Sequence, residues 1–493
     1  MAKPPTQRPW LLLWALLWLL PTPSLCGSMA AWWTDIGPSF VMQNASTGLI
    51  TYSLCHSNNT PLYPVDPPLN FETTYAPKNG TSLAATGWFD QSTTWASLFY
   101  QNNNDDIVNA VYRCNFQTGR YMHQESLVIS DRSGTPAPHT RTGLAVALLG
   151  EEEGYRVFFH DRSMRLQSLS FTRVESWSYG GPVSTNTNRS GMAIHTMFSG
   201  VRNVTVVTPR DDANMELTRL NIDGTWHIST FPTPLLGRNV TNLSNSTSFP
   251  YDNSSVPSFR LQAWDGNPTA VGIAIDTRLT RHIFYMGTDG RPHSVAAFVT
   301  GTTESAWRAQ PNQAEEFWPT ADGPSADFAI ASNIGRSVIR LYYLSGGRLV
   351  EAAYRNGNWD PAGPLRVANT TANAGGEEAA SSGLSTGAQA GIGVGVSVGV
   401  LLIAAAAAGL WMLRRRKKRA DDGGESAAAA AGGVFFRDRP GRVGEPGRVG
   451  RDRCPAEGRQ RHEEMESPNP ATELPEFGDR NELPTNKNVP ELP

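Results

Sequence analysis

The sequence predicts an all-β fold for residues 31–368, arranged as a six-bladed β-propeller. This region shows no sustained helical periodicity, and its aromatic and β-branched residues fall in short runs separated by Gly, Asn, Asp and Pro. Six hairpin-like runs recur at intervals of roughly 50 to 75 residues, which is typical of propeller blades with four strands each. A pair of β-sandwiches is the alternative arrangement. The six runs are residues 49–55, 96–115, 155–171, 201–226, 282–307 and 339–359.

The last run contains the clearest hairpin, VIRLYYLSGGRLVEAAYRNGNW. Gly346 and Gly347 tolerate the positive φ angles of a tight turn. With these two as the loop, Tyr342 pairs with Glu351, and Arg340 lies on the same face of the sheet as Glu351. Such diagonal neighbours have Cβ atoms about 7–8 Å apart. A guanidinium and a carboxylate at this spacing can both reach one small polar ligand between them.

The N-terminal residues 1–26 have the pattern of a secretory signal peptide. Lys3 and Arg8 precede an apolar run at residues 10–20, and a stretch with small residues follows it. Cleavage after Cys26 fits this pattern best, and cleavage after Ala30 is the alternative. An uncleaved anchor is the other interpretation, although the run is short for a membrane span.

Residues 390–413 form an uncharged run that is long enough to cross a bilayer of about 30 Å as a helix. Six consecutive cations, residues 414–419, follow it and mark the cytosolic end. We therefore expect a type I single-pass protein in the plasma membrane or a secretory-pathway membrane, with the N-terminal domain outside. Gly391, Gly395 and Gly399 have the small-xxx-small spacing of pairing helices, so a homodimer through this segment is one expectation. The general frequency of Gly in spanning helices is the other explanation.

Two further segments have the composition of unstructured chain. Residues 369–389 are rich in Ala, Gly, Ser and Glu and are expected to form a flexible stalk. Residues 414–493 form a basic and then mixed tail that is expected to be disordered. Repeated PGRVG and Glu-Leu-Pro strings there could bind an unknown cytosolic partner, or reflect low-complexity drift. The net charge of −3 does not indicate a nucleic-acid partner, and we predict none.

Glycosylation sequons and cysteines agree with this topology. Removal of Cys26 with the signal peptide leaves Cys55 and Cys114 outside and Cys454 in the tail. An even pair in an oxidising compartment predicts a Cys55–Cys114 disulfide, with two buried thiols as the alternative. All ten sequons lie between the signal peptide and the apolar run. They begin at Asn44, Asn58, Asn79, Asn188, Asn203, Asn239, Asn242, Asn245, Asn253 and Asn369.

The hairpin sequence Ile339-Arg340-Leu341-Tyr342, followed by a glutamate at Glu351 and by Gly-Asn-Trp359, resembles the fungal fucose-specific lectins. That family consists of six-bladed β-propellers with sugar sites between adjacent blades. The resemblance implies that Arg340 and Glu351 hydrogen-bond fucose hydroxyls and that Trp359 packs on the sugar. The chemistry suits these residue types, because a guanidinium donates two parallel hydrogen bonds and a carboxylate accepts another.

The other repeats depart from this pattern. The third repeat keeps Arg156, with Gln167 at the glutamate position and Trp177 after a longer turn, and so predicts a degraded site. The second, fourth and fifth repeats offer no ion pair, and the first is too divergent to align residue by residue, so avid multivalent binding by one chain is not expected. The arginine and glutamate positions hold Ser97 and Asn109 in the second repeat, Val204 and Thr218 in the fourth, and Ile283 and Ser294 in the fifth.

Structural roles compete with these binding roles. Arg340 and Glu351 could instead form a cross-strand salt bridge on a solvated face of the sheet. Four other tryptophans are expected to pack in the core or at blade junctions rather than to bind sugar. They are Trp88, Trp95, Trp264 and Trp318.

The sequence predicts no enzyme, cofactor or metal site. It contains no H-E-x-x-H, G-x-S-x-G or paired CxxC motif, and its acidic clusters, such as Glu151-Glu152-Glu153, lie in predicted turns. We therefore expect a membrane-anchored glycoprotein that recognises fucosylated or related glycans weakly. The alternative is a propeller scaffold or cell-surface sensor that binds no sugar and signals through its tail.

Overall fold

The computed structural model describes residues 28–368, except 65, 151, 201–202, 222, 238–239, 245–248, 253, 255–256, 258, 301–302 and 305. The predicted signal peptide, stalk, membrane span and tail therefore lie outside the described residues. The same holds for the sequons at Asn239, Asn245, Asn253 and Asn369. Within the described ranges, no helix has both the length and the apolar character needed to cross a membrane.

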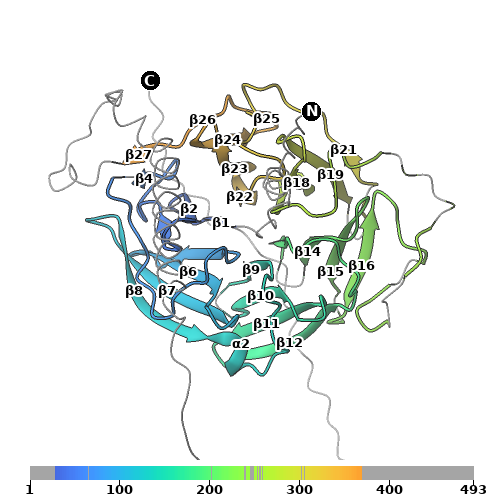
Figure 1. The fold of residues 1–493 in the computed structure, drawn as a ribbon, viewed down its shortest axis with the longest axis horizontal. Coiled ribbons are helices and arrows are strands. Elements are labelled where there is room, and N and C mark those ends of the chain that lie inside the picture. The colour runs from blue at the N-terminus through green and yellow to red at the C-terminus, as the bar shows by residue number, and fades with distance from the viewer. Residues whose placement is uncertain are drawn as a thin grey trace, which may run out of the picture. The chain divides into compact units, whose positions relative to one another are not determined.

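The described chain forms six antiparallel sheets, which we call blades 1 to 6 in chain order (Figure 1). Blade 1 has three strands, blades 2 to 4 have four each, and blades 5 and 6 have five each. Blade 1 contains β1 (Met29–Trp33), β2 (Pro38–Gln43) and β3 (Ile50–Tyr52). Blade 2 contains β5 (Ala84–Phe89), β6 (Thr94–Gln101), β7 (Ile107–Asn115) and β8 (Arg120–Val128). Blade 3 contains β9 (Leu144–Leu148), β10 (Tyr155–His160), β11 (Leu166–Thr172) and β12 (Ser176–Ser184). Blade 4 contains β13 (His195–Phe198), β14 (Val204–Pro209), β15 (Met215–Leu220) and β16 (Trp226–Phe231). Blade 5 contains β17 (Val271–Ile275), β18 (Thr280–Met286), β19 (Pro292–Thr300), β20 (Thr303–Glu304) and β21 (Arg308–Ala309). Blade 6 contains β22 (Phe328–Asn333), β23 (Val338–Ser345), β24 (Arg348–Arg355), β25 (Asn358–Trp359) and β26 (Gly363–Pro364).

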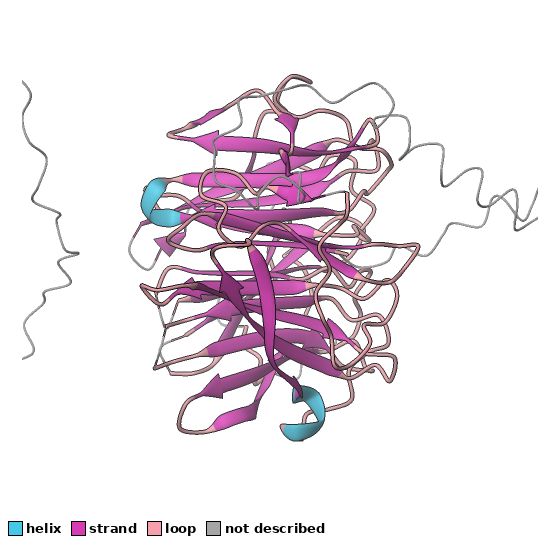
Figure 2. Ribbon diagram, turned by 90° about the vertical axis from the view of Figure 1, so that its left-hand side faces the viewer, coloured by secondary structure: helices cyan, strands magenta, loops and turns pink. Residues whose placement is uncertain are grey.

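The six blades close into a ring. The innermost strands β1, β5, β9, β13, β17 and β22 each contact the next one in this order, and β22 contacts β1. A separate parallel pair, β4 (Tyr63–Pro64) with β27 (Val367–Ala368), joins the end of the described chain to a segment that follows blade 1. Figures 1 and 2 show the ring along its axis and from the side. The six-bladed propeller is confirmed, and the sandwich alternative is wrong because every sheet meets two neighbours.

Apolar side chains fill the junctions between blades. Strand residues alternate between the two faces of a blade, so each blade contributes one row of side chains to each neighbour. Phe284 of blade 5 and Leu341 of blade 6, for example, belong to one buried cluster. Burial of such side chains stabilises each junction by about 1.5–3 kcal/mol per residue.

The hairpin of blade 6 has the register that the sequence predicts. Tyr342 pairs with Glu351, and the loop consists of Gly346 and Gly347, whose φ angles are 60° and 70°. Residues other than glycine rarely adopt such positive φ angles, which explains why glycine occupies both positions.

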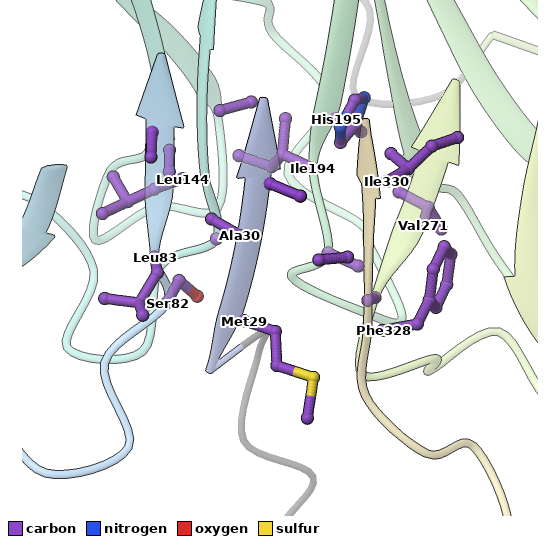
Figure 3. A pocket seen from close by; sticks show the side chains of 18 of the residues that line it. Met29, Ala30, Ser82, Leu83, Leu144, Ile194, His195, Val271, Phe328 and Ile330 are labelled. Atoms are coloured by element: carbon purple, nitrogen blue, oxygen red, sulfur yellow. The ribbon is translucent and has the colours of Figure 1, made fainter. Parts of the chain in front are cut away.

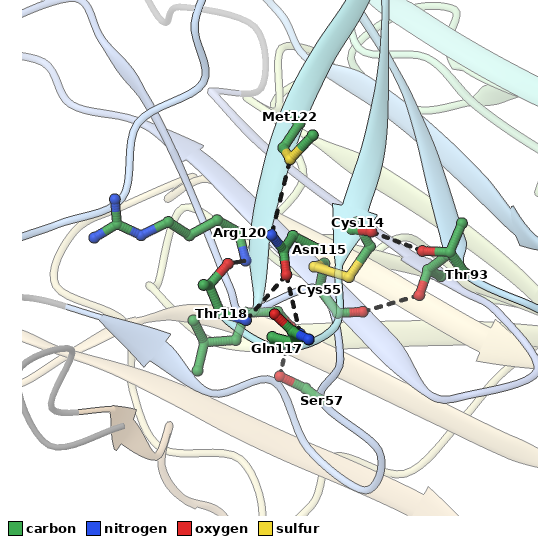
Figure 4. The surroundings of a disulfide bond; sticks show 11 residues. Cys55, Ser57, Thr93, Cys114, Asn115, Gln117, Thr118, Arg120 and Met122 are labelled. Atoms are coloured by element: carbon green, nitrogen blue, oxygen red, sulfur yellow. Dashed lines mark hydrogen bonds between the residues drawn. A yellow bond between two sulfur atoms is a disulfide. The ribbon is translucent and has the colours of Figure 1, made fainter. Parts of the chain in front are cut away.

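A disulfide joins Cys55, which follows blade 1, to Cys114 on β7 of blade 2, with a Cα–Cα distance of 5.7 Å (Figure 4). Both cysteines are buried. The hydroxyl of Thr93 donates to the Cys114 carbonyl at 2.7 Å, and that of Thr94 donates to the Cys55 carbonyl at 3.1 Å. The bond therefore lies in a buried, hydrogen-bonded part of the junction between blades 1 and 2.

The sequon-rich insertion after β16 is partly packed. Leu235 and Val240 form a small buried cluster with Ile228 of β16. The side chain of Asn242 is held at both ends, because its Nδ2 donates to the Pro182 carbonyl at 2.7 Å and its Oδ1 accepts from the amide of Trp226 at 2.9 Å. This sequon is thus engaged in the fold, unlike the exposed asparagine at position 58.

Candidate functional site at the junction of blades 6 and 1

Arg340 on β23 and Glu351 on β24 lie on one face of blade 6, and Arg340 Nη1 donates to Glu351 Oε1. Their side chains are only 4% and 14% exposed. The pair is therefore enclosed in the junction, and the expectation of a solvated sheet face is wrong. The face is covered because blade 1 packs against it, through a cluster that contains Phe40 and Tyr342.

Blade 1 and the loop after it supply two further contacts to this pair. The hydroxyl of Thr60 donates to Glu351 Oε2 at 2.7 Å. The guanidinium carbon of Arg340 lies 5.6 Å from the centroid of the Trp33 ring, within the range of a cation–π interaction. The candidate site is thus assembled from residues of the first and last blades, which are about 300 positions apart.

Buried donors without a hydrogen-bond acceptor among the described residues lie at this junction. They include Arg340 Nε and Trp33 Nε1. Buried polar groups are nearly always hydrogen-bonded, so such donors call for an explanation. Burial, with the Glu351 carboxylate beside it, holds the pKa of Tyr342 well above its usual range, so its hydroxyl stays protonated. The junction therefore combines a carboxylate, free donors and an indole ring, which are the groups that a polyhydroxylated ligand requires.

Trp359 does not belong to this site, although the sequence suggested it. It pairs with Tyr354, three residues from Glu351, and an odd separation along a strand reverses the face. Trp359 consequently packs on Trp318 and Phe284 at the junction of blades 5 and 6, with ring centroids 4.9 and 6.0 Å away. The aromatic partner of Arg340 is Trp33, which sequence reasoning missed because the contact crosses the ring closure.

The degraded site of the third repeat is not assembled. Arg156 pairs with Ser170 and Gln167 with Phe159, so their side chains point to opposite faces of blade 3. Arg156 donates to the Glu153 carbonyl at 3.0 Å, whereas Gln167 Nε2 donates to Asp161 at 2.7 Å. The prediction that Gln167 lies beside Arg156 was wrong because the turn between β10 and β11, residues 161–165, is longer than the two-glycine turn of blade 6.

Trp177 is also separate from Arg156. It lies at the junction of blades 2 and 3, where its ring stacks on Tyr155 at a centroid distance of 5.8 Å. In that junction the hydroxyls of Ser97 and Tyr155 are hydrogen-bonded at 2.7 Å. Trp177 therefore serves as packing.

The register identifies which residues occupy the Arg340 and Glu351 positions in the other blades. In blade 5, Phe284 pairs with Ser294, and His282 lies on the same face as both. The residue at the Arg340 position of this blade is therefore His282, and not Ile283 as the sequence suggested. At these two strand positions, blades 2 to 5 hold no arginine–glutamate pair, whereas blade 6 does. The corresponding pairs are Ser97 and Asn109 in blade 2, Arg156 and Ser168 in blade 3, Thr205 and Leu217 in blade 4, and His282 and Ser294 in blade 5.

A second charged cluster, not found from the sequence, is fully buried in blade 4. Glu216 Oε1 accepts from Arg189 at 2.5 Å, and Oε2 accepts from Arg210 at 2.6 Å. Burial opposes ionisation of Glu216, but the two guanidinium groups outweigh it and keep the pKa of this carboxyl below its usual range. Arg210 also contacts Tyr251 of the insertion, with its guanidinium 5.6 Å from the ring centroid. These mutual contacts give the cluster a structural role.

The four tryptophans assigned to packing divide into two groups. Trp318 is buried, and Trp264 lies edge-on to Tyr285 with its indole nitrogen bonded to a backbone carbonyl at 2.9 Å. Trp88 and Trp95 are half-buried and stack in parallel at 5.7 Å. In all four, the rings pack on protein.

The centre of the ring encloses a cavity of about 70 Å³, lined by the six innermost strands (Figure 3). Its walls are mostly apolar residues such as Ala30 and Leu144, together with His195. The volume holds a few water molecules and is far below the roughly 300 Å³ of a small-molecule pocket. Recognition is therefore better placed at a blade junction. Among the described residues, no group of three or more His, Cys, Asp or Glu could hold a metal ion.

No protein-family description and no curated protein sequence matches the chain. Solved structures with a similar fold include AofleA from Arthrobotrys oligospora, with a TM-score of 0.48 and 12% identity over 70% of this chain and 88% of that one. The Aleuria aurantia lectin, described as a six-bladed β-propeller with a fucose recognition mode, has a TM-score of 0.46 and 12% identity over 70% and 96%. An α-L-arabinofuranosidase from Clostridium thermocellum has a TM-score of 0.34 and 9% identity over 58% and 93%. The fold of this chain resembles that of fungal fucose-binding lectins, and at these identities the likeness concerns the fold alone.

Proposed function

We propose that this propeller recognises fucosylated or related glycans weakly, through the junction of blades 6 and 1. The observation that carries the proposal is the pair of buried donors without acceptors, Arg340 Nε and Trp33 Nε1, beside the Glu351 carboxylate. Sugar hydroxyls both accept and donate hydrogen bonds, so one pyranose can satisfy the donors and the carboxylate together.

The affinity is expected to be low. Glu351 is already paired with Arg340 and with the Thr60 hydroxyl, so a sugar hydroxyl must replace one of these contacts. Each exchanged hydrogen bond contributes little net free energy. A single junction also gives no avidity, unless two chains pair through residues 390–413.

The second candidate is a propeller scaffold or surface sensor that binds no sugar. The enclosure of Arg340 and Glu351, whose side chains are 4% and 14% exposed, favours it, because the pair could serve only to lock the ring closure. In either case we propose a non-enzymatic, single-pass glycoprotein of the plasma membrane or the secretory pathway. Its tail would bind a cytosolic partner.

Binding is tested with the purified full-length protein on a glycan array and by titration with α-methyl fucoside. The double variant Arg340→Met/Glu351→Met removes the polar groups without leaving a charge unpaired, and should abolish binding. Arg156→Ala, on blade 3, should leave binding unchanged. Absence of glycan binding by the folded parent protein would reject the lectin and support the scaffold.

Thr60 provides a finer test, with a matched control for glycosylation. Thr60→Ala frees Glu351 Oε2 but also destroys the sequon of Asn58. Asn58→Gln destroys the same sequon and keeps the hydroxyl. If the junction binds sugar, Thr60→Ala should change the fucoside affinity relative to Asn58→Gln. Equal affinities of the two variants would contradict binding at Glu351.

A further inference from the structure

The loop after blade 1 brings a glycosylation sequon to the candidate site. The hydroxyl of Thr60 donates to Glu351 Oε2 at 2.7 Å, and Thr60 is also the third residue of the sequon Asn58-Asn59-Thr60. Two residues of extended chain span at most about 7 Å, so the backbone of Asn58 lies within that distance of Thr60. A glycan on Asn58 would therefore begin beside the junction of blades 6 and 1.

The backbone of Asn58 is also fixed on the blade 1 side. Its carbonyl oxygen packs so closely on Gly37 that a Cβ atom at this glycine would lie 2.0 Å from it. Gly37 is the last residue of a turn, residues 34–37, that follows Trp33 directly and is closed by a backbone hydrogen bond of 3.0 Å. Asn58 is therefore held close to both sides of the candidate site, to Trp33 through this turn and to Glu351 through the sequon threonine.

The side chain of Asn58 is available for modification. Asn58 is exposed, its Oδ1 accepts from the amide of Asn59 at 2.7 Å, and its Nδ2 donates to no described residue. Nδ2 is the atom that carries the sugar in an N-linked glycan. The Nδ2 of Asn242, in contrast, donates to the Pro182 carbonyl at 2.7 Å. Asn58 thus combines an accessible amide with a position beside the junction.

We propose that Asn58 carries an N-linked glycan whose first sugars bind at the junction of blades 6 and 1, as an intramolecular ligand. This inference rests on the glycan recognition proposed above for the same junction. The glycan is transferred from a lipid diphosphate-linked oligosaccharide. Asn58 Nδ2 forms a bond to C1 of the first sugar and loses a proton, and the C1–O bond breaks with its electron pair left on the lipid diphosphate.

The attached sugars offer hydroxyls to the groups at the edge of the junction. The Glu351 side chain is 14% exposed, so its carboxylate can accept from a sugar hydroxyl without a rearrangement of the blades. The Thr60 hydroxyl already bonds to the same carboxylate. The chain's own glycan is therefore placed to contact the groups that an external glycan would contact.

Attachment makes even weak recognition effective. A ligand joined by a short flexible linker has an effective concentration in the millimolar range. External sugar then binds with an affinity lowered by the factor 1 + c/Kd, where c is the effective concentration of the attached glycan. For a Kd of about 1 mM and a c of about 2 mM, this factor is about 3, and about two-thirds of the junctions hold the attached glycan.

The first test is titration of full-length protein from secretory cells with α-methyl fucoside. Asn58→Gln removes the glycan and keeps the Thr60 hydroxyl, so it should bind about three times more tightly than the parent. Asn188→Gln is the matched control, because it removes an exposed sequon that precedes blade 4, and it should bind as the parent does.

The outcomes separate this inference from the proposed function. Equal affinities of the parent and Asn58→Gln, with binding present in both, would overturn the intramolecular ligand and leave the proposed function standing. Absence of fucoside binding by both proteins would reject the proposed function, and with it this inference.

Enzymatic release of the glycan covers the case in which Asn58→Gln does not fold. In the native protein, peptide-N-glycosidase should release the Asn58 glycan about three times more slowly than the Asn188 glycan, because only about a third of the Asn58 glycans are detached from the junction. The double variant Arg340→Met/Glu351→Met should remove this difference. A release rate at Asn58 that the double variant leaves unchanged, or an Asn58 without a glycan in peptide mapping, would overturn the proposal.

Discussion

Replacement of Arg340 and Glu351 by methionine, singly and together, tests whether the ring closure contains a desolvated ion pair. Removal of one partner of a buried pair costs about 3–5 kcal/mol, because the other charge stays buried. The two single variants should differ. Glu351 keeps the Thr60 hydroxyl and is 14% exposed, so Arg340→Met should cost about 3 kcal/mol. Arg340 is 4% exposed and loses its carboxylate partner while it keeps the Trp33 ring, so Glu351→Met should cost about 5 kcal/mol.

The double variant should be close to the parent in stability, because apolar side chains of similar volume replace the pair. The assay is denaturant unfolding of the full-length protein followed by tryptophan fluorescence, with the free energies combined in a cycle. A coupling energy below about 0.5 kcal/mol would refute the reasoning, since it is the level expected for independent sites. A Glu351→Met variant that is more stable than Arg340→Met would refute the asymmetry.

Four further predictions follow from the structure. Replacing Cys55 and Cys114 by serine opens a 59-residue loop and should cost about 4 kcal/mol under non-reducing conditions, measured by denaturant unfolding. Glu216→Gln leaves two buried guanidinium groups without an anion and should cost about 3–5 kcal/mol, whereas Glu153→Gln, at an exposed pair, should be nearly neutral. Burial lowers the pKa of His195 to about 4 in the folded state, so the unfolded state binds the proton first as the pH is lowered. Stability, measured as Tm, should therefore fall between about pH 6.5 and 4. His195→Asn should make this fall in Tm less steep, and an unchanged slope would contradict the assignment. Asn242 should carry no glycan in peptide mapping, because its Nδ2 is hydrogen-bonded to the Pro182 carbonyl, and high occupancy would contradict the contact.

The sequence predicted those features that depend on local chemistry. The Gly346-Gly347 turn sets the register of its own hairpin, so the shared face of Arg340 and Glu351 could be derived from two residues and strand alternation. The recurrence of such hairpins predicted the propeller, because each blade is one local unit repeated.

Features that depend on distant contacts or on turn length could not be predicted from the sequence. The five-residue turn of blade 3 shifts the register by one, so that Ser168 and not Gln167 shares a face with Arg156. Trp33 contacts Arg340 only because the first blade meets the last, and nothing in either local sequence encodes that distance. The Glu216 cluster likewise draws Arg189 from a loop outside the strands.

The junction of blades 6 and 1 differs from the other five in one mechanical respect. In the described chain, each of the other junctions is crossed by the backbone itself, whereas this seam depends on noncovalent contacts: Ser28 with Asp327, Thr60 with Glu351, and the short β4–β27 clasp. Tension applied at the C-terminal end of the domain acts first on the two-residue β4–β27 pair, so we expect the ring to open at this junction before the others. Amide exchange under load should therefore accelerate along β1 and β22 before it does so elsewhere. The junction of blades 6 and 1 would then be the first part of the domain to open under force.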